Sequence, residues 1–429
     1  VSYNNTAACT TLATNPNSSS IGTAITNPSA AFAVINSTRT YGNNADATAA
    51  AEFEKQFPYG AGTCPTNHTA VLATDQNFPD ALSGSYVSGR LATGILLTPT
   101  ASLSSETATA LRLEGIRTVY VMGGPLAVSS NVISQIKATP QYNCGGATQV
   151  GGTPAATITV IVIAGQNRYG TAQAAAEYFG TGGVGHPAVP GAYGTTYNDT
   201  SGKASTTGPS TAGNTAVLAT GTNFRDAISS SAVAYNVTLP LLLTDPSSLS
   251  QEASAGLINE GITQVFLVGG PLAVSDSVVS QLQGMGISVL RIAGQDGTDT
   301  AQLLAQFELN TGSNTAGVEG LAWAPITAAT PNTVNLSRGD FYPDALAGST
   351  IAGANKQPIL LTENPSTLGK YTTSFLNTGG ETGTGNGIDG MNNTTNVAQG
   401  QVGTLNVFGG PLAVNPSTVT AAANAISQG

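Results

Sequence analysis

A six-residue block, Gly-Gly-Pro-Leu-Ala-Val, occurs three times in the 429-residue chain and constrains the fold more than any other feature. Its glycine pairs are Gly123 and Gly124, Gly269 and Gly270, and Gly409 and Gly410. Three identical copies at nearly even spacing indicate three related structural units. The chain is therefore divided into an N-terminal tail and three repeats, at residues 1–30, 31–157, 158–286 and 287–429.

Other blocks recur in the same order within each repeat. A strand and a turn lead to a repeated aspartate, which is Asp80, Asp226 or Asp344. A short apolar strand then follows, formed by Ile95, Leu96 and Leu97, by Leu241, Leu242 and Leu243, and by Ile359, Leu360 and Leu361. The shared order shows that the repetition extends over most of each unit.

The pattern of the second repeat predicts four strands that alternate with four helices. The strands are expected at 158–164, 215–219, 239–243 and 264–268, and the helices at 171–179, 226–235, 249–260 and 275–283. Short apolar strands separated by helices are typical of a parallel sheet covered on both faces. We therefore expect an α/β fold of three tandem, doubly wound parallel-sheet subdomains of the Rossmann or Toprim type.

The repeated aspartates and glycines are candidate ligand-binding residues, each with a structural alternative. The aspartates follow strands, and the carboxyl ends of parallel strands bind ligands in α/β folds, so they could bind a cation or sugar hydroxyls. Alternatively, each carboxylate stabilises the first turn of a helix. The Gly-Gly turns lack the spacing and the lysine of a phosphate-binding loop, which favours a sharp strand-to-helix turn. The Ile-Leu-Leu stretches are most simply core strands.

Composition excludes several functional classes. Charged residues make up 8% of the chain and the net charge is −10, so no basic stripe is available for nucleic acid. The longest apolar runs are far shorter than the ~20 residues that span a bilayer. There are two histidines and no Gly-x-Ser-x-Gly or His-Glu-x-x-His motif, so no enzyme is expected. A carboxylate pair formed by Asp80 and Asp226 across a subdomain interface is the remaining catalytic alternative.

Several features predict an extracellular protein. The chain begins Val1-Ser2-Tyr3, without a basic start and an apolar stretch, as expected after removal of an export signal. A disulfide between Cys64 and Cys144 would suit an oxidising compartment, although Cys9 is an alternative partner for either cysteine or for another chain. Candidate glycosylation sites occur at Asn4, Asn17, Asn36, Asn67, Asn198, Asn236, Asn335 and Asn392, although a chain rich in Asn, Ser and Thr produces such sites by chance.

Occurring together and in order, these motifs resemble the cell-wall-binding repeat type 2 family of Gram-positive surface proteins. The matching elements are Arg-Tyr-Gly, Leu-Ala-Thr-x-x-Asn-Phe-x-Asp-Ala, Ile-Leu-Leu-Thr and Val-x-Val-x-Gly-Gly-x-x-Ala-Val. The resemblance implies a pseudo-threefold arrangement of the subdomains and non-covalent attachment to an anionic cell-wall polymer. It also implies that the Ile-Leu-Leu stretches lie near the polymer groove.

The arginine of the Arg-Tyr-Gly turn is present as Arg168 and, one place shifted, as Arg39, whereas the third repeat has Gly297 there. Arg39 and Arg168 are the best candidates for contact with a polymer phosphate or carboxylate, because a guanidinium binds such groups in a bidentate manner. Alternatively, each arginine pairs with a repeated aspartate of its own chain.

Two functional hypotheses follow. In the first, the protein is structural and assembles with copies of itself into a surface layer or filament, because low charge removes repulsion between neighbours. Residues 1–30 could then add to the sheet edge of a neighbouring copy, or fold over their own domain. In the second, the protein is a monomeric anchor for an anionic wall polymer. Because a net charge of −10 opposes a polyanion, binding would require local arginines or a bridging divalent cation such as calcium, and no other cofactor is expected.

Overall fold

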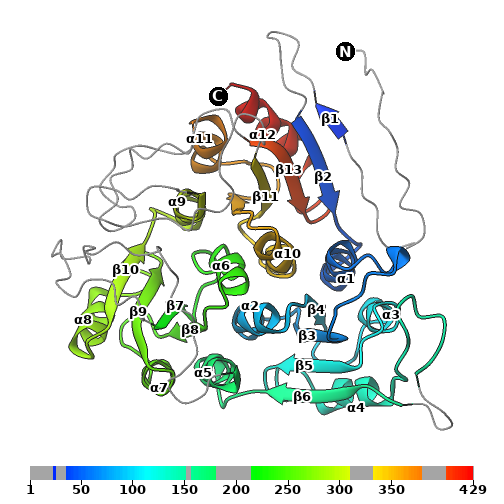
Figure 1. Ribbon diagram of the computed structural model, residues 1–429. Helices are drawn as coiled ribbons and strands as arrows, with labels where there is room; N and C mark the ends of the chain where they lie inside the picture. The colour runs from blue at the N-terminus through cyan, green and yellow to red at the C-terminus, as the bar shows by residue number, and fades with distance from the viewer. Residues whose placement is uncertain are drawn as a thin grey trace.

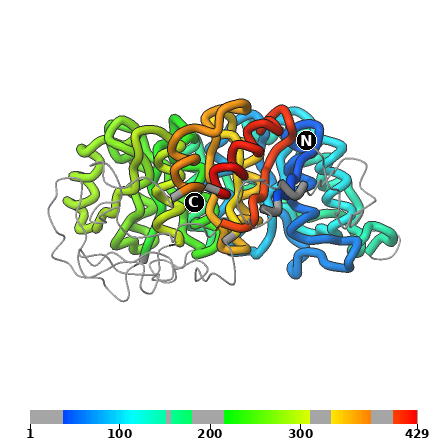
Figure 2. The backbone as a smooth tube through the Cα atoms, turned by 90° about the horizontal axis from the view of Figure 1, so that it is seen from above, coloured from blue at the N-terminus to red at the C-terminus, as the bar shows by residue number. Residues whose placement is uncertain are grey.

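The protein forms three parallel sheets with helices on both faces, arranged as a triangle around a common axis (Figure 1). The structure is a computed structural model that describes residues 23–25, 35–150, 156–179, 214–309, 332–378 and 402–428. The view from above in Figure 2 shows a body that is wide and flat. The predicted fold, three α/β subdomains with pseudo-threefold symmetry, is confirmed. No described helix is both long enough and apolar enough to cross a membrane.

The first sheet has the strand order β4-β3-β5-β6. Its strands are β3 (Thr69–Thr74), β4 (Ile95–Thr98), β5 (Thr118–Met122) and β6 (Thr159–Ile163). The helices that connect them are α2 (Pro79–Leu91), α3 (Ser105–Leu113) and α4 (Ser130–Ala138), and the 3-10 helix η1 (Tyr59–Ala61) precedes β3.

The second sheet has the order β10-β9-β7-β8. Its strands are β7 (Asn214–Thr220), β8 (Leu241–Thr244), β9 (Ile262–Val268) and β10 (Ser288–Ile292). Its helices are α5 (Arg168–Phe179), α6 (Ser230–Asn236), α7 (Gln251–Asn259) and α8 (Asp276–Gly284). The helix predicted at 226–235 begins only at Ser230, because Arg225 stands where the other repeats have Pro79 and Pro343, residues that suit the first helical turn.

The third sheet has the order β1-β2-β13-β11-β12 and is the only one of the three described sheets with an antiparallel strand. Its strands are β1 (Thr23–Ile25), β2 (Ile35–Thr40), β11 (Asn332–Arg338), β12 (Ile359–Thr362) and β13 (Val402–Phe408). The accompanying helices are α9 (Gly297–Leu309), α10 (Pro343–Ala354), α11 (Lys370–Thr378) and α12 (Pro416–Gln428). Helix α1 (Ala45–Gln56) follows β2 and packs against β4 and α3 of the first subdomain. Part of the N-terminal tail, β1, therefore pairs with its own chain, and the remainder of the tail lies outside the described residues.

The three sheets are offset by one strand from the sequence repeats. β6 and β10, which begin the second and third repeats, complete the sheets of the repeats before them, beside β5 and β9. In the same way β2 lies beside β13, so the N-terminal strand completes the last sheet and closes the ring. The helix after each closing strand packs against the following subdomain, as α5 does against α7 and β8. The repeat boundaries chosen from the sequence thus cut between a sheet and its own edge strand.

Alternate residues of the central strands enter two different cores. Val71 and Ala73 of β3 face a core that all three subdomains share, whereas Ala70 and Leu72 face a separate core under α3 and α4. The shared core surrounds α2, α6 and α10, which pack against one another around the axis (Figure 1). Because one core links the three units, the ring is a single packed body.

Candidate functional site

Three loops meet around the pseudo-threefold axis at the carboxyl ends of β3, β7 and β11. We call them the axial loops, and they comprise residues 75–79, 221–225 and 339–343. Each sends one aromatic ring to the axis, namely Phe78, Phe224 or Tyr342. The ring centroids lie 5.8, 6.0 and 5.5 Å apart, in the tilted or edge-to-face arrangements that aromatic rings prefer. The Tyr342 hydroxyl also donates to the Asp75 carbonyl at 2.7 Å, so the three loops hold one another in place.

The sequence contains the signal for this aromatic triangle, but sequence reasoning missed it. The rings belong to the same repeated blocks as the three aspartates, and only the aspartates were considered as site residues. An aromatic residue at the same point of all three repeats, beside a predicted pseudo-threefold axis, would have been sufficient to predict the cluster.

The repeated aspartates connect neighbouring subdomains. Each accepts a hydrogen bond from a threonine near the start of the helix that follows the closing strand: Asp80 from Thr171, Asp226 from Thr300 and Asp344 from Thr48. The Thr300–Asp226 bond measures 2.7 Å. The same threonine oxygens accept the backbone N–H of Gly165, Gly294 and Gly42, at 3.2, 3.0 and 3.1 Å. Each junction of the ring therefore contains the same Gly–Thr–Asp chain of hydrogen bonds.

The first glycine of each Gly-Gly turn fits closely over one of these carboxylates. Gly123, Gly269 and Gly409 have φ values of +99°, +112° and +98°, a backbone conformation that favours glycine. A Cβ atom at Gly123 or Gly409 would overlap the carboxylate of Asp80 or Asp344. The geometry supports the structural interpretation of the Gly-Gly turns, and Gly124, Gly270 and Gly410 continue each turn toward its helix.

The same geometry argues against a ligand-binding role for the aspartates. Burial raises the pKa of Asp80 and Asp226, although the threonine hydrogen bonds partly oppose this effect. Burial likewise raises the pKa of Asp344 to about 6. Within the described ranges, no group of three or more His, Cys, Asp or Glu residues is placed to hold a metal ion. A bridging calcium ion stays a prediction, because this part of the chain offers it no such group.

Arg39 does not occupy the position of Arg168, which corrects the alignment made from sequence. Arg39 lies on the closing strand β2 beside Val407, and its structural counterpart is Arg291, which lies on β10 beside Leu267. Arg39 donates to the carbonyls of Gly409 and Val414 at 2.6 and 2.8 Å. Arg291 makes the equivalent bonds to Gly269 and Val274 at 2.7 and 2.8 Å. Each guanidinium group thus stabilises the Gly-Gly turn beside it through hydrogen bonds to backbone carbonyls.

Arg168 connects two axial loops. Its guanidinium donates to the Gly221 carbonyl and lies 5.9 Å from the centroid of the Phe78 ring. Arg39 and Arg168 are therefore both engaged within the chain, although with backbone carbonyls rather than with the repeated aspartates.

The Ile-Leu-Leu strands are entirely inside the protein. No side chain among the nine is more than 1% exposed. In this structure they form the core, and a polymer beside them could contact only neighbouring residues. The residues concerned are Ile95, Leu96, Leu97, Leu241, Leu242, Leu243, Ile359, Leu360 and Leu361.

By contrast, the leucine of each Gly-Gly-Pro-Leu-Ala-Val block is almost fully exposed. Leu126, Leu272 and Leu412 are 96%, 99% and 89% exposed. Each leucine follows a Gly-Gly-Pro turn and precedes a helix, and this position was the only sequence signal for its exposure.

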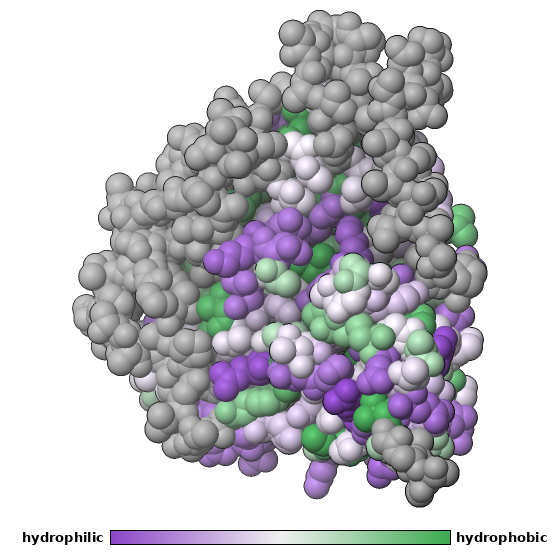
Figure 3. Space-filling view, turned by 45° about the vertical axis from the view of Figure 1, so that its right-hand side comes forward, coloured by the Kyte–Doolittle hydropathy of each residue, from purple (hydrophilic) through white to green (hydrophobic). Residues whose placement is uncertain are grey.

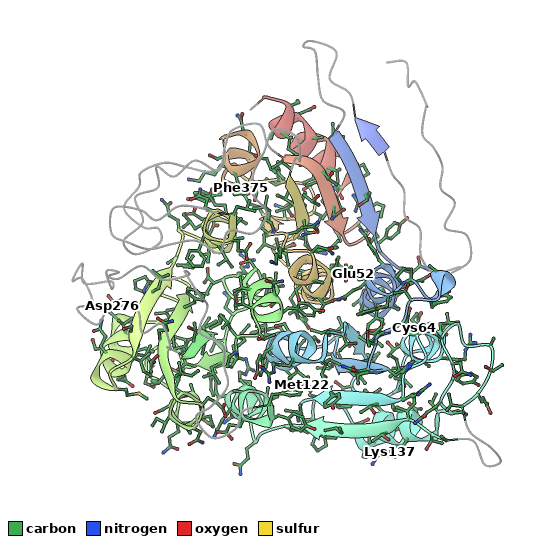
Figure 4. The ribbon with its side chains drawn as sticks, in the orientation of Figure 1. Glu52, Cys64, Met122, Lys137, Asp276 and Phe375 are labelled. Atoms are coloured by element: carbon green, nitrogen blue, oxygen red, sulfur yellow. A yellow bond between two sulfur atoms is a disulfide. The ribbon has the colours of Figure 1, made fainter. Side chains whose placement is uncertain are left out.

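The predicted disulfide is present, and the glycosylation candidates differ in accessibility. Cys64 and Cys144 are bonded, and Figure 4 marks Cys64 in the first subdomain. Asn67 is exposed, Asn236 donates to the Gly353 carbonyl at 2.7 Å, and Asn335 is completely buried. Asn335 is thus not accessible for modification in the folded protein. The side chains of Asn4, Asn17, Asn36, Asn198 and Asn392 lie outside the described residues, as does Cys9.

The ring-closing junction is expected to lose stability as pH rises. Burial, and then the charges of Asp75 and Glu106, raise the pKa of Asp46 to about 7. Between about pH 4 and pH 7 the unfolded chain loses the Asp46 proton while the folded protein retains it, so the free energy of unfolding should fall across this window. Asp46→Asn should flatten that part of the curve. Urea unfolding of both proteins from pH 4 to 8 tests this, and parallel curves would contradict it.

Comparison with known proteins places these features in a family. Residues 39–133, 162–279 and 291–419 match the model of cell wall binding domain 2. The chain is 27% identical over 304 residues to the N-acetylmuramoyl-L-alanine amidase LytC of Bacillus subtilis (strain 168), covering 70% of this chain and 47% of that protein. It is 32% identical over 127 residues to an uncharacterized protein of Pyrococcus abyssi, covering 29% of this chain and 33% of that protein.

Solved structures share the fold. Cwp8 and Cwp6 from Clostridium difficile superpose with TM-scores of 0.60 and 0.61, at 18% and 15% sequence identity. The matches cover 91% and 95% of this chain and 52% and 51% of those chains, so this chain spans about half of their length. Because the family model matches all three repeats and most of the chain, this protein belongs to the cell wall binding domain 2 family and is a cell-wall-binding repeat protein.

Proposed function

We propose that this protein is a non-enzymatic component of the cell surface. It binds an anionic cell-wall polymer through the axial loops and assembles with copies of itself into a layer or filament. The observation that carries the proposal is the family match in all three repeats, combined with the meeting of three equivalent loops at one place. The amidase activity in the name of LytC belongs to that protein, of which this chain covers less than half.

The axial loops carry groups suited to a charged polysaccharide. Arg225 is exposed, and its guanidinium makes no hydrogen bond within the described residues. Arg338, the last residue of β11 and the neighbour of the third axial loop, donates two hydrogen bonds to Asp340, at 2.8 and 2.9 Å, and lies 5.4 Å from the centroid of the exposed Phe341 ring. Exposed amides of Asn77 and Asn223 complete the set. Guanidinium groups bind phosphate or carboxylate, and amides and aromatic faces suit sugar hydroxyls and rings.

Replacing the axial arginines should weaken wall binding. Arg225→Ala combined with Arg338→Ala removes one exposed and one half-buried guanidinium group, and loss of charged hydrogen bonds should lower the affinity by about tenfold or more. Lys137→Ala is the matched control, because Lys137 is exposed in the last turn of α4, away from the axis (Figure 4). Sedimentation with purified walls measures the effect. Equal loss with the control, or no loss with the arginine variant, would contradict the site.

The surface is compatible with dense packing of copies. Small hydrophobic and hydrophilic areas alternate on the face shown in Figure 3, and only 8% of the residues are charged. Interfaces of this kind depend little on salt. Electron microscopy of the purified chain, with and without calcium, distinguishes this proposal from the second candidate, a monomeric anchor. Ordered sheets or filaments support assembly, and dispersed particles that still bind walls support the anchor.

A further inference from the structure

The three closing strands are equivalent in the fold, but at one position β6 differs in kind from the other two. Arg39 on β2 and Arg291 on β10 brace the Gly-Gly turns beside them. The counterpart on β6 is Val162, which pairs with Val121 as the arginines pair with Val407 and Leu267. Val162 is 46% exposed, whereas Arg291 is 3% exposed. The first subdomain thus presents an apolar side chain where the other two have an arginine bound to the protein.

β6 is also an open sheet edge. It is the last strand of the first sheet, and in the described part of the chain no strand pairs with its outer side (Figure 1). Thr159 is exposed, and Val160 and Ile161 are partly exposed. No charged residue occurs between Lys137 and Arg168, so this edge lacks the charges that usually prevent edge-to-edge pairing.

The third sheet shows that such an edge accepts an antiparallel strand. The outer side of β2 is paired with β1, in the register Thr23–Ser37, Ala24–Asn36 and Ile25–Ile35, and the described pairs end two residues before Arg39. Because β6 occupies the same place in its own sheet, an added strand is compatible with this architecture.

The main-chain groups of β6 define which strand fits. In the parallel ladder with β5, the amide of Thr159 donates to Arg117 and the carbonyl of Ile163 accepts from Gly123, so alternate residues point inward. Val160 and Val162 therefore direct their N–H and C=O groups outward, and neither residue has a hydrogen-bond partner there among the described residues. On the amino-terminal side the amide of Ile158 is bonded to Thr139, so the free edge is limited to β6.

We propose that β6 pairs in antiparallel fashion with β6 of a second copy, across a twofold axis at Ile161. The sequence Val160-Ile161-Val162 is the same in both directions, so Val160 of each copy lies opposite Val162 of the other. This register joins the outward N–H and C=O groups of both valines and places the two Ile161 residues opposite each other as a pair without mutual hydrogen bonds. It rests on the proposed self-association and specifies one contact within it.

Val162→Arg is the direct test. The new arginine would occupy the place of Arg39 and Arg291 and could reach the carbonyls of Gly123 and Val128, so the fold should be retained while the edge gains a charge. In sedimentation velocity, the wild type should show a concentration-dependent dimer and the variant should show its complete loss. Ile258→Arg is the control, because Ile258 is 66% exposed on α7 and should not affect the dimer. A wild type that stays monomeric, or a Val162→Arg protein that still forms dimers, overturns the proposal.

A cross-link tests the register independently. In a Cys9→Ser background, Ile161→Cys should form an intermolecular disulfide, because directly opposed Cβ atoms lie about 5 Å apart. Thr159→Cys should not, because two Thr159 residues would be about 14 Å apart along the strands. Non-reducing gels measure both. If Val162→Arg abolishes the dimer but Ile161→Cys forms no cross-link, the twofold register is wrong and another strand pairs with this edge. If the Val162→Arg protein still forms the same sheets or filaments as the wild type, the proposed assembly stands and the β6 contact is overturned.

Discussion

Phe78→Ala is expected to lower the free energy of unfolding by about 4 kcal/mol, because a buried phenylalanine loses both its transfer free energy and its packing when it is truncated. Phe78 is 8% exposed and contacts Phe224 and Tyr342 of the other two axial loops, as well as Arg168 at the start of α5. The cavity would open at the axis, where a shift of one loop cannot fill it without displacing the other two. Urea unfolding followed by circular dichroism measures the change.

Phe341→Ala provides a matched control for that variant. Phe341 belongs to the axial loop of the third subdomain, but its ring is 43% exposed, lies beside Arg338 and touches the aromatic triangle only at Tyr342, with the two centroids 5.1 Å apart. We expect it to cost less than about 1 kcal/mol, as substitutions at exposed sites usually do. Equal effects of the two substitutions would show that the aromatic triangle does not stabilise the ring.

Sequence repetition predicted the units correctly but not where one sheet ends and the next begins. A repeat has a period, and any starting point along it gives an equally regular division. Which strand completes which sheet depends on tertiary packing: α5 fits between two subdomains only if β6 stays with the first. Closure of the ring could not be predicted for the same reason, because the pairing of β2 with β13 joins opposite ends of the chain.

The candidate residues show a similar limit. Asp80, Asp226 and Asp344 were predicted at the carboxyl ends of strands, and they lie there. Their role depends on the threonine partners Thr171, Thr300 and Thr48, which lie in a different repeat. Each threonine precedes an alanine and stands six residues after a glycine, a repeated pattern to which the sequence analysis assigned no role. Arg291 was not considered, because it stands inside a strand pattern in which an apolar residue is expected. A charged residue within a predicted buried strand is a signal that the sequence does contain.

Removal of the disulfide is the second change with a large expected effect. The bond closes a loop with a sequence separation of 80, and the entropy of the unfolded chain predicts a stabilisation of about 4 kcal/mol. Cys64→Ala combined with Cys144→Ala, in a Cys9→Ser background, should therefore unfold at markedly lower urea concentration than Cys9→Ser alone. Dithiothreitol should lower the stability of Cys9→Ser to about the same extent and leave the triple variant unchanged.

The bond also bears on the open edge of the first sheet. Cys144 lies in the segment 139–150, whose Thr139 and Gln141 bond to the chain just ahead of β6. Without the disulfide this segment should open more often, so that the free edge of β6 extends beyond Thr159 toward the amino terminus. The triple variant should then associate more strongly than its Cys9→Ser parent at the same concentration of folded protein, as measured by sedimentation velocity, and Val162→Arg should still abolish that association. A triple variant with normal stability and no response to dithiothreitol would show that the bond does not stabilise the fold. If the triple variant associates no more strongly than its parent, segment 139–150 does not control the accessibility of the β6 edge.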